Sequence, residues 1–272
     1  HLPLFLSEPD RSRLWEESPH NAGSFLTNRL LSRHVGETTL STGRHFMAPQ
    51  FAVDASAVLP PFPAMGRNED GVFRVAMSLL HPCGLVAHLP FAVFHEPKSD
   101  IAPLPAPSQP FGPRISDYLL AALMEYEALR PAADCAAGAY QSVGLHLAGL
   151  AAMPADSFEQ WCRWTWARVI AQRVRQGEEL LRLHKNSPEI WAEVMEGHLE
   201  ALESSIDNVA PEELTSTGSG ATVAMGDDAS STSESLARVQ RYLGEYGTIL
   251  QAWPAVWRAA RTIDLSEFAT SL

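Results

Sequence analysis

The chain has 272 residues, 46% of them hydrophobic and 19% charged, and a formal net charge of −12 at pH 7. This composition is typical of a globular protein with one large domain or two modest ones. Its acidity argues against binding of nucleic acid or an anionic membrane through the overall field of the protein. Three widely spaced cysteines without a Cys-x-x-Cys pair, and no apolar run long enough to cross a membrane, favour a cytoplasmic protein without a transmembrane segment.

The first hundred residues predict a small α/β segment. A short helix is expected at about 24–33, and strands joined by a Thr-Gly turn are expected within 37–55. The prolines of "AVLPPFPAMG", residues 57–66, predict an ordered or semi-rigid loop, because each one restricts φ and removes a backbone donor. Apolar residues at helical spacing then predict a helix within 68–84, and "LVAHLPFAVFHEP", residues 85–97, reads as a short strand or strand pair.

A proline-rich linker, residues 98–113, is the expected boundary between a domain at 1–97 and a helical bundle domain at 114–272. A Ser/Thr/Gly-rich stretch at about 208–233 predicts a mobile loop within this bundle. The overall prediction is an α/β fragment followed by a mostly helical bundle, so that the chain is predominantly helical. The helices of the bundle are expected at 115–129, 133–153, 156–185, 187–206 and about 233–262.

Two adjacent carboxylates, Glu69 and Asp70, stand where the proline-rich loop meets the first of these strongly periodic helices. Carboxylates in a first turn are stabilised by the exposed backbone N–H groups and the positive end of the helix dipole, which is a purely structural explanation. A functional explanation requires a rigid loop and a second polar group nearby. The prolines supply the first, and His95, at the end of an apolar strand, is the candidate for the second.

The segment from about residue 38 to 97 resembles the closing part of the catalytic domain of GT-A glycosyltransferases, especially family 2-like enzymes. The resemblance lies in the acidic pair heading an apolar helix, followed by "LPFAVFH", which ends at His95. It implies that Asp70 is the general base of an inverting transfer, that Glu69 orients it or binds acceptor, and that His95 ligates Mn²⁺ or Mg²⁺. Arg67 and Asn68 are then assigned to substrate binding, with Arg67 at the diphosphate; the alternative for Arg67 is a solvated loop residue.

The implied chemistry agrees with the residue types. A sugar hydroxyl is a poor nucleophile, so a positioned carboxylate assists by removing its proton during attack. A divalent cation neutralises the charge that develops on the departing nucleoside diphosphate. The sequence lacks the Asp-x-Asp motif that holds the metal in the first half of a GT-A domain. The expectation that follows is a chain that begins inside the catalytic domain, acting on a nucleotide-sugar donor and an unidentified acceptor.

A second hypothesis is a non-catalytic helical module that binds a protein partner or forms a homo-oligomer through its helical domain. The arginines of residues 156–185 make that helix locally basic, which could suit a phosphate-rich partner, but we expect an acidic protein to neutralise such a helix internally. Trp161 and Trp164 in this helix are spaced to share one helix face, as are Trp253 and Trp257 in the last helix, which predicts ordinary core packing. The alternative is a sugar-stacking platform that would also include Trp166.

Overall fold

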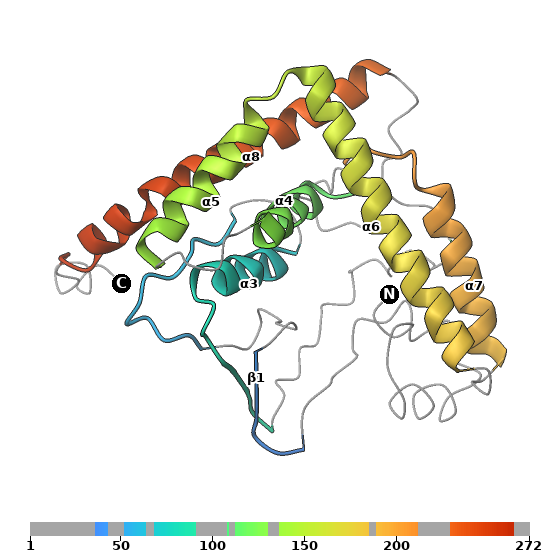
Figure 1. Ribbon diagram of the computed structural model, residues 1–272, viewed down its shortest axis with the longest axis horizontal. Coiled ribbons are helices and arrows are strands. Elements are labelled where there is room, and N and C mark those ends of the chain that lie inside the picture. The colour runs from blue at the N-terminus through green and yellow to red at the C-terminus, as the bar shows by residue number, and fades with distance from the viewer. Residues whose placement is uncertain are drawn as a thin grey trace, which may run out of the picture. The chain divides into compact units, whose positions relative to one another are not determined.

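The computed structural model describes residues 36–42, 52–63, 68–90, 108, 112–129, 136–184, 189–211 and 229–263. Most of these residues lie in helices, and one small two-stranded sheet accompanies them (Figure 1). The prediction of a predominantly helical chain is therefore confirmed. The helix expected at 24–33 lies outside the described residues. In the described part of the chain, no helix combines the length and apolarity that a membrane crossing requires.

The chain divides into two compact units that are each discontinuous in sequence. The first contains residues 1–37, 89–114 and 159–236, and the second contains residues 38–88, 115–158 and 237–272. Both units therefore combine described residues from before and after the proline-rich stretch. The assignment of 1–97 to a catalytic domain stays a prediction.

The sheet of the second unit pairs β1, Thr39–Ser41, with β2, Val86–His88, in antiparallel register. The Oγ atom of Ser41 lies 2.8 Å from Nε2 of His88, 47 positions along the chain. The sequence instead predicted that strands within 37–55 would be joined by the Thr-Gly turn. The turn and most of the second strand of that prediction lie outside the described residues, so it stays a prediction; the pairing of β1 with β2 was not expected, because a local pattern does not reveal a partner so far along the chain.

The helix α3, Glu69–Leu80, connects the region of the proline-rich loop to β2. It ends before Pro82, which cannot continue a helix, and the backbone N–H of His81 donates to the carbonyl of Met77 at 2.8 Å. Its apolar side is fully buried and packs against α4, Ile115–Leu129, and α5, Ala136–Ala151. The buried residues are Val72, Phe73, Val75, Ala76, Leu79 and Leu80.

Glycines bring α5 close to α8, Ala229–Ala260. A Cβ atom added at Gly144 would lie 2.6 Å from the carbonyl oxygen of Gly247, and one added at Gly247 would lie 2.8 Å from that of Gly144. Both contacts are to backbone, so the two helices meet at this crossing without room for a side chain. The helix α8 contains Pro254, as predicted.

The start of α8 differs from the sequence-based prediction. Residues 229–233 begin this helix, whereas a mobile loop was expected to continue to 233; residues 208–211 are irregular and 212–228 lie outside the described residues. Ser and Thr are poor helix formers in isolation, but the long apolar stripe that follows compensates for them through packing.

In the first unit, α6, Ala155–Leu183, packs against α7, Glu189–Ser204 (Figure 1). Trp166 and Trp191 are buried in their shared core, and the indole N–H of Trp166 donates to the carbonyl of Ser205 at 2.8 Å. Helical periodicity predicted all of the helices from α4 to α7 to within about three residues at each end, as expected when one face is buried.

Candidate functional site

The candidate site begins with Asn68, the residue that precedes α3. Its φ of 70° and ψ of 27° are left-handed, and it is the one described residue other than glycine with a positive φ. Asparagine tolerates this conformation better than most residues, and such backbone is enriched at functional sites. The Asn68 carbonyl accepts the first helical hydrogen bond, from the N–H of Val72 at 3.1 Å.

The side chain of Asn68 lies against Gly71. A Cβ atom at Gly71 would overlap Oδ1 of Asn68, so any residue other than glycine at position 71 would displace the Asn68 side-chain amide. The "NEDG" sequence therefore has a local explanation: asparagine for the left-handed turn and glycine for the space above it. This geometry fixes the direction in which the two intervening carboxylates leave the backbone.

The two carboxylates are in different environments. Glu69 is exposed, whereas Asp70 is partly buried, and its Oδ1 accepts a hydrogen bond from the N–H of Gly71 at 2.8 Å. Both lie in the first turn of α3, where the helix dipole favours negative charge. Asp70 is thus the more rigidly oriented of the pair, as a general base requires, and Glu69 is the more accessible.

The loop that precedes α3 is held by side chains from far along the sequence. We call residues 56–63 the proline strap; Pro60, Pro61 and Pro63 in it are buried. Three of its backbone carbonyls accept hydrogen bonds from side chains on helices of the second unit. The bonds are Tyr140 OH to Val58 O at 2.6 Å, Trp253 Nε1 to Leu59 O at 2.5 Å and Tyr246 OH to Pro61 O at 2.9 Å.

Burial raises the pKa of Tyr140 and of Tyr246, so both phenols stay protonated as donors across the physiological range. Phe62 of the strap also stacks on the buried ring of Phe73 in α3, with ring centroids 4.0 Å apart. The prediction of an ordered loop is confirmed for the described residues. This ring contact joins the strap to α3 at Phe73, one turn after the acidic pair.

The sequence did not identify the side chains that bind the strap. Trp253 was expected to be ordinary core, yet its indole N–H donates to the strap, and nothing local marks Tyr140 or Tyr246 as donors to a loop about 80 and 185 positions away. Their only sequence signal is an amphipathic ring in a mostly apolar helix, because such rings usually find a hydrogen-bond partner when buried.

Two of the five predicted site residues, Arg67 and His95, lie outside the described residues. The structure brings Asn68, Glu69 and Asp70 together at the start of α3. Other histidines of this unit are engaged elsewhere: Nε2 of His81 lies 2.8 Å from the carbonyl oxygen of Val58, and His88 contacts Ser41.

The described residues do not assemble a divalent-cation site. In the described ranges no three side chains of His, Cys, Asp or Glu converge on a point that one ion could occupy. The oxygens of Glu69 and Asp70 are suitable ligands for Mg²⁺ or Mn²⁺, but two adjacent carboxylates in one helical turn do not complete a coordination shell.

A different surface stands out on α6 in the first unit. Trp164, which was expected to pack in the core, is 56% exposed, and the guanidinium of Arg168 lies 4.6 Å from its ring centroid. The prediction of core packing is wrong here because Trp166 occupies the buried face two positions later. The internal neutralisation expected for the arginines is confirmed for two of them, which pair with glutamates of α6: Arg163 with Glu159 at 2.7 Å and Arg182 with Glu179 at 2.6 Å.

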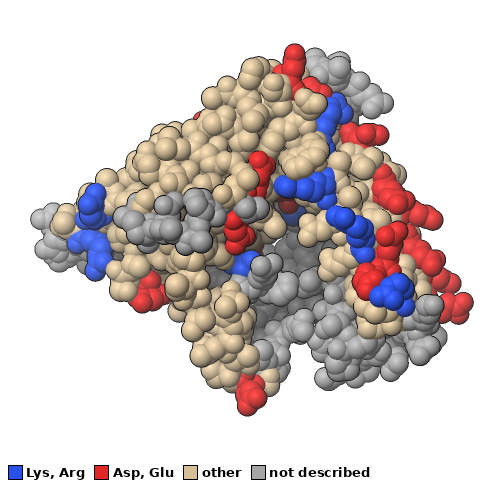
Figure 2. Space-filling view, in the orientation of Figure 1, with Lys and Arg blue, Asp and Glu red and all other residues tan. Residues whose placement is uncertain are grey.

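The two helices of the first unit differ in charge, because α6 carries both signs and α7 carries acidic residues without Lys or Arg. Acidic side chains gather over α7, while the blue side chains of Figure 2 follow α6. The exposed acidic residues of α7 are Glu189, Glu193, Glu196, Glu200 and Glu203.

No protein-family model, curated protein or solved structure matches this chain.

Proposed function

We propose that this chain contributes the acceptor side of a glycosyltransferase site, with Asp70 as the general base. The observation that carries the proposal is the geometry at the start of α3. A left-handed Asn68 and a side-chain-free Gly71 flank the acidic pair, and the hydrogen bond from Gly71 N–H holds one oxygen of Asp70 at 2.8 Å. The proline strap, held by Tyr140 and Tyr246, stacks Phe62 on Phe73 of α3 and so supports the helix that carries Asp70, as a positioned base needs.

In the proposed reaction, Asp70 takes the proton of an acceptor hydroxyl while that oxygen attacks the anomeric carbon of the donor sugar. The bond from this carbon to the nucleoside diphosphate breaks, and the diphosphate leaves with the bonding electrons. Glu69, which is exposed, binds a neighbouring hydroxyl of the acceptor, and the Asn68 amide binds substrate beside it. In the same proposal, Arg67 binds the diphosphate and His95 ligates Mn²⁺ or Mg²⁺. The variant His95→Ala should therefore bind the donor more weakly in the presence of the metal, as measured by calorimetry.

The test compares Asp70→Asn with the unaltered protein. Release of nucleoside diphosphate is measured with a panel of UDP- and GDP-sugars and hydroxyl-bearing acceptors. Asp70→Asn should lower turnover by about 10²- to 10⁴-fold, the usual contribution of a general base. The affinity for the donor should change little, because the base acts on the acceptor.

Asp156→Asn is the matched control, since Asp156 is an exposed aspartate in the first turn of another helix, α6. Both variants lose a favourable interaction with a helix dipole, about 0.3–1 kcal/mol of stability. Only Asp70→Asn should also lose turnover. Equal turnover in the two variants would show that Asp70 merely stabilises its helix.

A second candidate, the non-catalytic helical interaction module, is favoured by the exposed Trp164 and the Arg168 stacked on it. Tryptophan and arginine are the residues most enriched at the energetic centres of protein interfaces. This candidate is preferred if the unaltered protein releases no nucleoside diphosphate with any member of the panel.

A further inference from the structure

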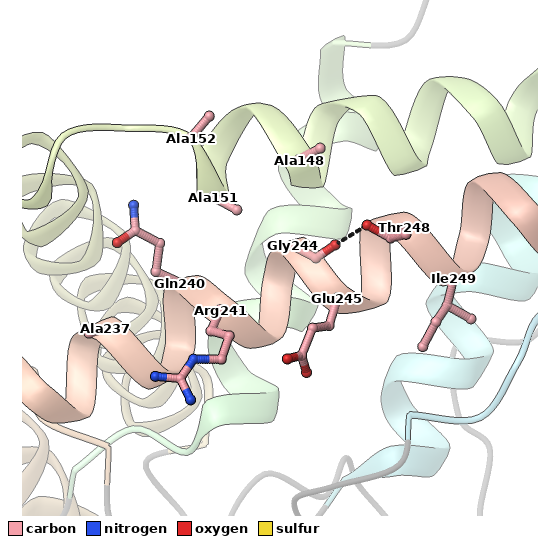
Figure 3. A pocket seen from close by; sticks show the side chains of 10 residues that line it. All are labelled: Ala148, Ala151, Ala152, Ala237, Gln240, Arg241, Gly244, Glu245, Thr248 and Ile249. Atoms are coloured by element: carbon pink, nitrogen blue, oxygen red, sulfur yellow. Dashed lines mark hydrogen bonds between the residues drawn. The ribbon is translucent and has the colours of Figure 1, made fainter.

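An open groove runs between α5 and α8 in the second unit, with a volume of about 870 Å³ (Figure 3). The α5 side is lined by small residues, Ala148, Ala151 and Ala152. On the other side, α8 presents a row of exposed residues spaced four apart, which we call the α8 ridge. Its members are Ala237, Arg241, Glu245 and Ile249.

The charges of the α8 ridge have no ion-pair partner among the residues that the structure describes. In the described part of the structure, neither Arg241 nor Glu245 has an ion pair within 4.0 Å, although they are four residues apart on one helix. Arginine N-terminal to glutamate is the less favourable order for such a pair, and Figure 3 shows both side chains leaving the same side of α8 without meeting. Each charge is therefore available to a partner.

The order of the ridge is self-complementary. If a second copy of α8 crosses it antiparallel about a two-fold axis near position 243, Arg241 meets Glu245 of the other copy, and Glu245 meets its Arg241. The same register places Ile249, which is 42% exposed, opposite Ala237 at both ends of the contact. One symmetry operation therefore matches both the charges and the sizes of the side chains.

The groove beside the ridge is shallow near the proposed axis. Gly244 lines it, and a Cβ atom added there would lie 3.1 Å from Cβ of Ala151, so glycine lets α8 approach α5 closely at this point. Rows of residues spaced four apart are the ridges that interdigitate in the commonest class of helix crossing. The alanines that line the α5 side of the groove are also small, so they leave space beside the α8 ridge.

We infer that the α8 ridge and the adjoining groove bind a second copy of this chain, forming an antiparallel two-fold dimer. The test uses the full chain and sedimentation equilibrium over a range of concentrations. Arg241→Glu brings carboxylates together at both symmetric contacts, and Glu245→Arg brings guanidinium groups together there. Each single variant should dimerise at least about tenfold more weakly than the unaltered protein, because two attractive contacts become repulsive.

An equimolar mixture of the two single variants should form a heterodimer with nearly the original affinity, because opposite charges again face each other at both contacts. The double variant Arg241→Glu/Glu245→Arg should also regain self-association. Arg258→Glu is the control: Arg258 is exposed on the same helix, about 22 Å along it from the axis, and its reversal should leave dimerisation unchanged.

Circular dichroism of each variant confirms that these exposed substitutions leave the helices intact. A protein that stays monomeric at all concentrations overturns the inference and leaves the groove to a different occupant. Single variants that dimerise like the unaltered protein, or a mixture that fails to associate, exclude this register.

Discussion

The contact between α5 and α8 makes a strong prediction about two glycines of the same helix. Gly144→Ala places a methyl group 2.6 Å from the Gly247 carbonyl oxygen and 3.2 Å from the Gln251 backbone nitrogen. Ordinary contacts begin at about 3.4 Å, so the two backbones must separate by close to 1 Å. Gly149→Ala, in the same helix, meets nothing within 4 Å and is the matched control.

The two substitutions share a gain in helix propensity of about 0.5–1 kcal/mol, so their difference isolates the cost of overpacking. That cost is about 1–3 kcal/mol, and we expect the upper part of this range because the atoms in conflict are backbone. Gly149→Ala should therefore stabilise the protein by up to about 1 kcal/mol, whereas Gly144→Ala should destabilise it by about 1–2 kcal/mol.

Urea denaturation followed by circular dichroism and tryptophan fluorescence measures both values. If Gly144→Ala is as stable as Gly149→Ala, the two helices do not meet at this crossing and the packing described for α5 and α8 is refuted. A loss near 2 kcal/mol with unchanged dependence on urea concentration supports it.

Two further predictions concern buried polar groups. Tyr246→Phe removes the donor to the buried Pro61 carbonyl and should lower the free energy of unfolding, measured by urea denaturation, by about 1–3 kcal/mol. Tyr126→Phe is the control: its ring packs beside His146, and the substitution should change the free energy of unfolding by less than about 0.5 kcal/mol. Equal effects would mean that the strap is not held through its carbonyls. Burial raises the pKa of the Cys162 thiol from 9.0 to about 12, so alkylation at pH 8.5, followed by mass spectrometry of the peptides, should modify exposed Cys83 far faster than Cys162. Because the folded pKa is the higher one, the contribution of this thiol to stability is complete below pH 9 and is lost between pH 9 and about 12; comparable alkylation rates for the two cysteines would contradict its burial.

The candidate site was predictable only in part. The position of Asn68, Glu69 and Asp70 at a helix start could be read locally, because a turn former, two acidic residues and an apolar stripe follow one another there. The contacts of the proline strap could not be predicted locally, because the side chains that donate hydrogen bonds to its carbonyls come about 80 to 190 positions later in the chain. Roles for Arg67, His95 and the cation stay predictions.

The sequence by itself determined the helices. Each turn of a helix is closed by hydrogen bonds between residues four apart, so helix formation is local. The 3.6-residue period of apolar residues and the prolines at helix ends therefore predict it from the sequence. Tertiary structure decided the rest: β1 pairs with a strand that follows α3, Trp164 faces outward, and Gly144 meets Gly247. These outcomes depend on which distant surfaces are complementary in shape and hydrogen bonding. No local pattern encodes that choice, because it exists only when both partners are folded.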